Sequence, residues 1–236
     1  MKRIKFYINQ LTQKRLNIKI SIPILTFVVS FICACNKDEC PSLFEIPIEI
    51  SPQKLEYHIG DTITLTSKFY KMVYDRATKK SYDMSEIRWK PFTNIDRLDS
   101  IFDFTKTRFN KNIYFVKDLN YKYNIFTFSD GSNQLNGEYN YSNDTFDLKY
   151  SLVLKIKGTY IMKHVSANYI GGHFEHQSFK GSCNDGFDVF TNMNNGADNN
   201  SILLKDSPDR IYSDALYNDL ENRFHKAGGY CFKVLL

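Results

Sequence analysis

The sequence predicts a mainly β fold, a sandwich or barrel-like β domain with one C-terminal helix packed on it. Tyrosine and phenylalanine, which favour strands, are abundant, with 16 and 19 copies among 236 residues. Short stretches alternate apolar and polar residues and are separated by glycine-containing turns, as strands of such folds are. A single stripe of apolar residues at helical spacing lies near the C-terminus.

The first 34 residues have the composition of a leader. Residues 1–19 carry six basic and no acidic side chains, and the thirteen residues 20–32 carry no charge. Thirteen helical residues span about 20 Å, less than the roughly 30 Å hydrocarbon core of a bilayer, so this run predicts a secretory signal. Without the leader the chain has 25 basic and 26 acidic residues. This balance lacks the excess of positive charge that nucleic-acid binding needs, and nucleic acid is not an expected partner.

One short motif spans the end of the leader and a second one follows it. Ile32-Cys33-Ala34-Cys35 resembles the lipobox of bacterial lipoproteins. The resemblance implies that 1–34 is a lipoprotein signal peptide and that Cys35 carries palmitate-type acyl chains that hold the protein in the lipid bilayer. Asn36-Lys37-Asp38-Glu39 resembles the export signal of surface lipoproteins of the Bacteroidota. It implies an outer-membrane protein that faces the cell surface, with a periplasm-facing anchor as the alternative.

We expect residues 35–45 to be a tether and residues 46–236 a single β-rich domain, with a sub-boundary near 181–205. Residues 46–52 alternate in polarity and predict a strand that ends at Pro52. Residues 54–70 predict two further strands with a turn at Gly60-Asp61. The segment from Pro52 to Leu65 resembles the opening strands of bacterial immunoglobulin-like modules, and this resemblance implies an immunoglobulin-like sandwich.

The middle of the chain is less uniform. In 71–110, Phe92, Ile95, Leu98 and Phe102 have helical spacing, whereas 87–90 and 102–107 fit strands equally well. Residues 111–180 contain six strand-like segments divided by turn residues, which favours a sandwich or barrel. Gly158-x-Tyr160 resembles the tyrosine corner of immunoglobulin-like sandwiches, although an ordinary strand aromatic is slightly favoured.

The C-terminal part of the chain changes character. Residues 181–201 are rich in Asn, Gly and Asp and predict a long exposed loop. Ser207 and Pro208 predict a helix start, with a hydroxyl cap and a proline at the first helical position. The apolar stripe consists of Tyr212, Leu216, Leu220 and Phe224. Gly228-Gly229 should end the helix, and residues 230–236 predict a final strand.

Three cysteines besides Cys35 remain after removal of the leader. Outside the cytoplasm a disulfide is expected, and Cys183 with Cys231 is the favoured pair. Cys40 with Cys231 is the main alternative, and three unpaired buried thiols are a further one.

One cluster has residue types suited to metal binding or hydrolysis. On a strand, His173 and Glu175 share a face and His176 points away, so histidines on a solvated face are favoured. Asp185 and Asp188 do not have the spacing of a calcium-binding loop. We therefore expect no metal site and no cofactor. An envelope hydrolase or metal-dependent enzyme that uses His173, Glu175, Asp185 and Asp188 is the alternative function.

The predicted function is non-enzymatic. An anchored β module without a convergent acid, base or nucleophile is expected to act as a binding or interaction module for a glycan or a protein. Aromatic side chains are common binding anchors, so Trp89 and the exposed tyrosines are the contacts to test.

Overall fold

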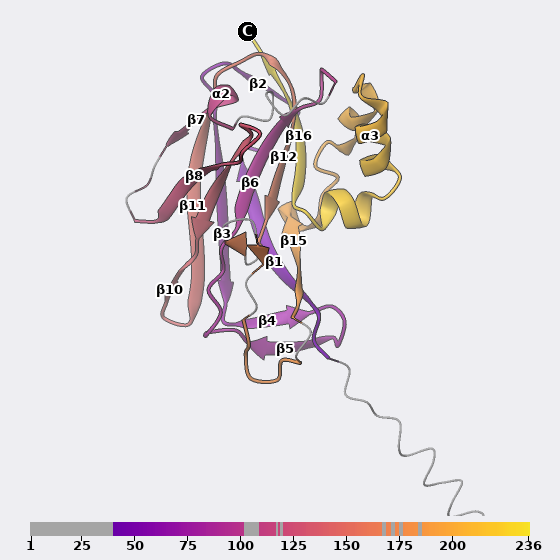
Figure 1. Cartoon of the computed structure of the whole chain (residues 1–236). Helices are drawn as coiled ribbons and strands as arrows, with labels where there is room; N and C mark the ends of the chain where they lie inside the picture. The colour runs from indigo at the N-terminus through magenta and orange to yellow at the C-terminus, as the bar shows by residue number, and fades with distance from the viewer. Residues whose placement is uncertain are drawn as a thin grey trace, which may run out of the picture. The chain divides into compact units, whose positions relative to one another are not determined.

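The computed structural model describes residues 40–101, 109–116, 118, 120–166, 169–170, 173–174, 177–183 and 186–236, with 169–170 and 173–174 described through their backbone only. All of them belong to one unit, Cys40–Leu236. Two sheets pack face to face, and helical segments cover part of one of them (Figure 1). The expected mainly β sandwich is confirmed, and the two sheets remain separate rather than closing into a barrel.

The first sheet has the strand order β10-β11-β3-β1-β4-β5, with β15 paired to β1 and β7 paired to β11. Its strands are β1 (Leu43–Ser51), β3 (Thr62–Tyr70), β4 (Met72–Asp75), β5 (Lys80–Asp83), β7 (Ile113–Val116), β10 (Asn140–Ser142), β11 (Thr145–Leu154) and β15 (Asp188–Met193). The pairing of β3 with β11 is antiparallel over nine residues and forms the centre of this sheet.

The second sheet has the order β2-β16-β12-β6-β9-β8. Its strands are β2 (Glu56–His58), β6 (Phe92–Arg97), β8 (Lys122–Thr127), β9 (Asn133–Glu138), β12 (Gly158–Val165) and β16 (Gly229–Leu235). A separate pair joins β13 (Tyr169–Ile170) to β14 (His173–Phe174). The final strand expected from residues 230–236 is confirmed as β16, and the helical spacing near Phe92 gives strand β6 instead.

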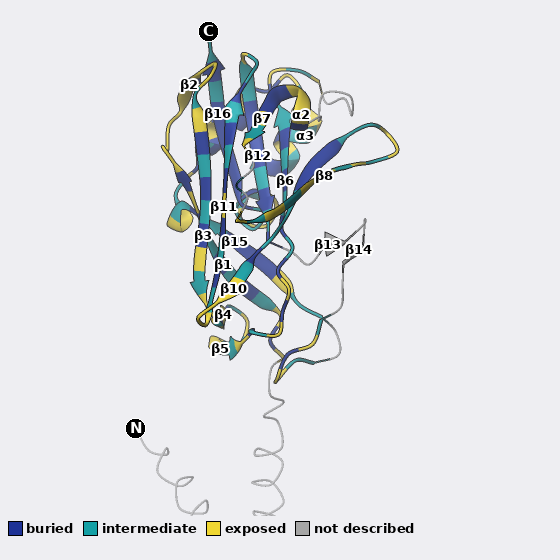
Figure 2. Ribbon diagram, turned by 90° about the vertical axis from the view of Figure 1, so that its left-hand side faces the viewer, coloured by how far each residue is buried: buried dark blue, intermediate teal, exposed yellow. Residues whose placement is uncertain are grey.

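Period-two alternation explains how the strands build the core. On β1, Phe44, Ile46, Ile48 and Ile50 are buried while the residues between them are not. Strand β11 alternates in the same way (Figure 2). Because successive side chains of a strand point to opposite faces, this pattern turns one face of each sheet toward the other. The aromatic residues counted in the sequence fill the space between the sheets, as the edge-to-face contact of Phe44 with Phe179 illustrates.

Helical segments cover the outer face of the second sheet. They are the 3-10 turn η3 (Ser201–Asp206), helix α3 (Arg210–Tyr217) and a π-helical turn η4 (Glu221–His225). The 3-10 turn η2 (Asn194–Gly196) lies against β1 and β15 of the first sheet, and the short helix α2 (Phe109–Asn112) lies against β6, β7 and β9. Leu216 and Phe224 pack with Ile161 of β12 and Cys231 of β16 in a second hydrophobic cluster. The expected stripe is therefore confirmed. No helix among the described residues is long and apolar enough to cross a membrane.

The helix begins two residues later than expected. Asp209 caps α3, and its carboxylate accepts a hydrogen bond from the Tyr212 backbone N–H at 3.0 Å. The expected start at Ser207 and Pro208 is wrong because Ser207 has an extended backbone that closes η3. Aspartate and serine are similarly good caps, so local preference does not decide between the two positions.

The tether also ends earlier than expected. Strand β1 begins at Leu43, and Phe44 is fully buried, so residues 43–45 belong to the sandwich. The buried carboxylate of Asp75 accepts hydrogen bonds from the backbone N–H groups of Ser42 and Leu43, at 3.0 and 2.7 Å. Burial alone would raise the pKa of Asp75, but hydrogen bonds from Thr78, Leu43 and Ser42 outweigh burial and lower it. The first strand is therefore fixed at its beginning.

Residues 181–201 are not one exposed loop. Strand β15 lies within them and pairs in parallel with β1, from Leu43 opposite Asp188 to Ile48 opposite Met193. After β15, the backbone adopts left-handed conformations at several asparagines, a conformation that asparagine tolerates better than most residues. These are Asn194, Asn195, Asn199 and Asn200, with φ between 54° and 58°. The asparagines that predicted a loop therefore form tight turns instead.

Tyr160 forms a tyrosine corner. Its hydroxyl donates a hydrogen bond to the Ile156 carbonyl, four residues earlier, at 2.8 Å. A bond from a strand tyrosine to the backbone a few residues upstream is the defining feature of this motif in immunoglobulin-like sandwiches. The interpretation of Tyr160 as an ordinary strand aromatic is therefore wrong.

Tyr160→Phe is expected to lower the free energy of unfolding by about 1 kcal/mol, because one partly buried hydrogen bond is lost while the ring stays in place. Urea unfolding, followed by the fluorescence of Trp89, measures the change. Tyr114→Phe is the matched control, because Tyr114 is 62% exposed. Equal stability of Tyr160→Phe and the unmodified protein would contradict a stabilising role of the corner.

Candidate functional site

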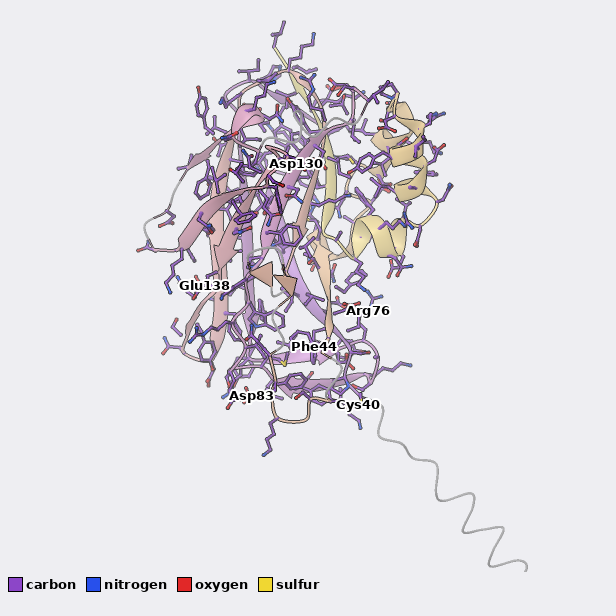
Figure 3. The ribbon with its side chains drawn as sticks, viewed as in Figure 1. Cys40, Phe44, Arg76, Asp83, Asp130 and Glu138 are labelled. Carbon is purple, nitrogen blue, oxygen red and sulfur yellow. A yellow bond between two sulfur atoms is a disulfide. The ribbon has the colours of Figure 1, made fainter. Side chains whose placement is uncertain are left out.

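The disulfide joins Cys40 to Cys183, 143 residues apart in the sequence. The expected pair Cys183–Cys231 and its alternative Cys40–Cys231 are both wrong. Cys231 is a free, fully buried thiol in the cluster between β16 and the helical segment. Burial raises the pKa of this thiol well above its ordinary value, so it stays protonated. Figure 3 labels Cys40 and Phe44, both toward the end of the sandwich where β4 and β5 lie.

Trp89 is not a surface contact. It is 1% exposed and packs edge-to-face with Phe69, Phe146 and Phe187, with ring centroids 5.8 to 6.3 Å apart. The expectation that Trp89 could contact a ligand is therefore wrong, because a large apolar ring contributes more to the sandwich core than to its surface. Exposed tyrosines do occur among the described residues: Tyr70, Tyr74, Tyr114 and Tyr141.

The residues expected for the alternative enzyme are not brought together where the structure describes them. Glu175, His176 and Asp185 lie outside the described residues, and His173 is described only through its backbone in β14. Asp188 is exposed and forms an ion pair with Lys226 at 2.6 Å. No group of three potential metal ligands occurs among the described residues. The Cys35 lipidation site also lies outside them.

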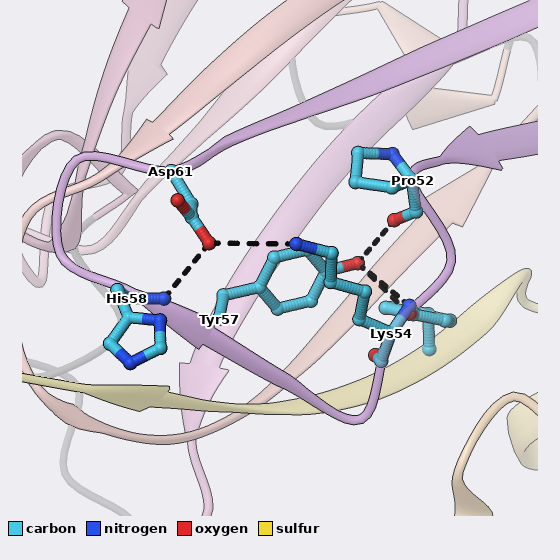
Figure 4. A network of polar contacts seen from close by, with 6 residues as sticks. Pro52, Lys54, Tyr57, His58 and Asp61 are labelled. Atoms are coloured by element: carbon cyan, nitrogen blue, oxygen red, sulfur yellow. Dashed lines mark hydrogen bonds and ion pairs between the residues drawn. The ribbon is translucent and has the colours of Figure 1, made fainter.

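A polar network surrounds Tyr57 of β2 (Figure 4), and Tyr230 extends it to β16. The Tyr57 hydroxyl donates to the Pro52 carbonyl at 2.5 Å, and the Tyr230 hydroxyl donates to the Lys54 carbonyl at 2.6 Å. The two hydroxyls are 3.0 Å apart. Burial raises the pKa of both tyrosines, so both remain neutral phenols. The network fixes the chain between β1 and β2.

A hollow of about 280 Å³ lies beside this network. Lys54, Asp198 and Asn200 are among the residues that line it. The Asn200 amide donates to the carbonyls of Lys54 and Cys231, at 3.1 and 2.8 Å. These two hydrogen bonds hold the asparagine turns against β16 and leave the Asn200 amide already engaged within the protein. The hollow is therefore mainly a product of loop packing.

A second hollow, of about 290 Å³, lies where β6 ends, β12 begins and β16 ends. We call it the basic pocket, and its lining includes Arg97, Asp99, Lys157, Gly158, Lys233 and Leu235. These strand ends lie at the end of the sandwich opposite to β4 and β5 (Figure 1).

A paired arginine and aspartate fix one wall of the basic pocket. Arg97 donates from Nε and Nη2 to the two carboxylate oxygens of Asp99, each at 2.8 Å. The Thr159 N–H also donates to Asp99, at 3.2 Å. Burial alone would raise the pKa of Asp99, but the arginine and this N–H hold it below its usual range. A Cβ at position 158 would lie 2.9 Å from Arg97 Nη2 and from Asp99 Oδ2, so glycine lets the pair approach the strand.

Comparison with known proteins identifies no family. No family model matches the chain, and no curated protein matches it. Among solved structures, a type II cohesin domain from the cellulosome of Acetivibrio cellulolyticus is 11% identical, over 62% of this chain and 91% of that chain, with a TM-score of 0.29. A type II cohesin dyad from the same organism is 14% identical, over 66% and 49%, with a TM-score of 0.31.

A third structure, the group B streptococcus pilus 2b backbone protein, is 13% identical over 54% of each chain, with a TM-score of 0.21. TM-scores this low carry no argument about function. The class of the protein is therefore defined by its own strands, as a two-sheet β-sandwich with a helical segment on one outer face.

Proposed function

We propose that the chain is a lipid-anchored envelope lipoprotein of the outer membrane, exposed at the cell surface, in which the sandwich is a non-enzymatic binding module. The observation that carries the proposal is the disulfide between Cys40 and Cys183. Structural disulfides are typical of proteins outside the reducing cytoplasm. This bond agrees with the export signal and the lipobox that the sequence resembles.

The position of the disulfide also suits an anchored module. Cys40 is five residues after Cys35, the expected lipid attachment site. Two or more acyl chains would hold the protein at a membrane stably, because each buried CH₂ contributes about 0.8 kcal/mol. The bond would then join the anchored end of the chain directly to the sandwich at Cys183. The basic pocket lies at the opposite end of the sandwich, where a ligand can reach it.

Protease added to intact cells tests the anchor and its orientation. We expect the unmodified protein to be membrane-bound and cleaved. Replacement of Lys37, Asp38 and Glu39 by alanines should leave it membrane-bound and protected, and Cys35→Ala should release it from the membrane fraction. These positions precede the sandwich, so the substitutions should leave its fold unchanged and a difference in cleavage reports on location alone. Protection of the unmodified protein, with a periplasmic marker equally protected, would contradict surface exposure and favour a periplasm-facing anchor.

A further inference from the structure

Uncompensated positive charge gathers in the basic pocket. Lys157 and Lys233 line it, and neither ammonium group makes an ion pair or hydrogen bond with a described residue. Arg97 is already paired with Asp99, so the two lysines leave an excess of two positive charges. Lys157 is exposed and Lys233 is half-buried, and both line the hollow.

The charge of the whole chain does not explain this excess. Without the leader, the chain has 25 basic and 26 acidic residues. Glu56 is the register partner of Lys233 across β2 and β16, yet no ion pair joins the two side chains. Concave surfaces with one sign of charge concentrate ligands of the opposite sign. The basic pocket therefore has the electrostatics of an anion site.

Asp99 makes the basic pocket suited to more than a bare anion. A carboxylate has about four acceptor positions, and three are used by Arg97 Nε, Arg97 Nη2 and the Thr159 N–H. One position is left for a hydroxyl donor. Leu235 adds an apolar surface beside the two lysines. Cations, a hydroxyl acceptor and an apolar wall together match a sugar ring that carries an acidic group.

We propose that the basic pocket binds the carboxylate or sulfate group of an acidic saccharide, with Lys157 and Lys233 as its direct partners. The inference rests on the proposed binding function and names its ligand class. A volume of about 290 Å³ is near the lower limit of ligand pockets, roughly 300 Å³, and suits one or two sugar units. The Asp99 carboxylate disfavours a bare sulfate ion, which has no hydroxyl at neutral pH to donate to it and offset the repulsion.

Equilibrium binding to the full-length protein, purified in a neutral detergent, tests the proposal. The probes are a sulfated oligosaccharide, an oligogalacturonate, a neutral maltooligosaccharide, inorganic sulfate and vesicles of anionic phospholipid. The variant Lys157→Gln/Lys233→Gln removes both lysines. Lys80→Gln/Lys180→Gln is the matched control, because it removes the same charge from exposed positions away from the pocket lining.

We expect the unmodified protein to bind one or both acidic oligosaccharides and not the neutral one. The pocket variant should bind about tenfold or more weakly, because two charge-assisted hydrogen bonds are lost. The control variant should bind within about twofold of the unmodified protein, since distant surface charges are screened by salt.

Three results would overturn the proposal: no binding of either acidic oligosaccharide, an equal loss in both double variants, or binding confined to inorganic sulfate or to vesicles. None of them changes the protease result on intact cells. A failure of the ligand class is therefore distinguishable from a failure of the anchored, surface-exposed module.

Discussion

Replacing Cys183 with serine is expected to lower the free energy of unfolding by about 4 to 5 kcal/mol, because the bond to Cys40 closes a loop of well over a hundred residues. In the chain-entropy model, removal of the bond stabilises the unfolded state, because the opened loop gains conformational freedom. The loop contains both sheets except for β15, β16 and the helical segment. A loss of this size is comparable with the whole stability of many domains.

The Cys40–Cys183 bond predicts a specific pattern of stability losses among cysteine variants. Cys40→Ser, Cys183→Ser and the double variant should be destabilised equally, since each removes the same bond. Cys231→Ala should lose only the packing of one small buried side chain and should keep the disulfide in a non-reducing mass measurement. Urea unfolding followed by Trp89, the one tryptophan of the chain, gives the free energies. Additive losses in the double variant, or a larger loss in Cys231→Ala, would contradict the Cys40–Cys183 bond.

Local patterns predicted much of the sandwich. Strands β1, β3 and β11 were expected because apolar and polar residues alternate regularly along each of them. This pattern is visible within a single stretch of sequence, because successive side chains of a strand point to opposite faces of the sheet. The stripe of α3 and η4 was expected for the same reason, at helical period. Strand β15 was missed because both of its faces are partly buried and its residues, DVFTNM, do not alternate.

Features made by long-range pairing could not be predicted in this way. The spacing of the three cysteines in the sequence does not indicate which two form a bond. The parallel pairing of β15 with β1 brings the segments that precede these strands, with Cys183 and Cys40, to the same end of the sheet. The basic pocket combines positions 97, 157 and 233, which meet through the antiparallel register of β6, β12 and β16. Nothing within ten residues of any one of them indicates the other two. The position of Trp89 likewise depends on contacts from three distant segments.

A buried histidine is expected to make the free energy of unfolding depend strongly on pH. His164 of β12 is 1% exposed, and its Nδ1 lies 2.9 Å from both the Thr93 hydroxyl and the Tyr150 hydroxyl. Those two hydroxyls also contact each other. The Nε2 atom of His164 has no hydrogen-bond partner among the described residues. Burial lowers the pKa of His164 from 6.5 to about 3, because a protonated ring would be charged, buried and left with an unpaired N–H.

This lowered pKa makes the sandwich sensitive to acid. The unfolded chain takes up a proton on His164 as the pH falls below about 6.5, while the folded protein does not until about pH 3, so stability is lost across that interval. The full effect is roughly 5 kcal/mol, of which about 2.7 kcal/mol falls between pH 7 and 4.5.

Urea unfolding at the two pH values measures this loss, and His164→Asn is the matched variant. We expect the variant to be less stable at pH 7, since it leaves a cavity, but to lose about 2.7 kcal/mol less than the unmodified protein on acidification. Asp75 has a lowered pKa and Asp96 a raised one, but both are present in both proteins and cancel in the comparison. Parallel acid profiles would mean that His164 is protonated in the folded state, and that the three-group contact with Thr93 and Tyr150 opens to let water reach Nε2.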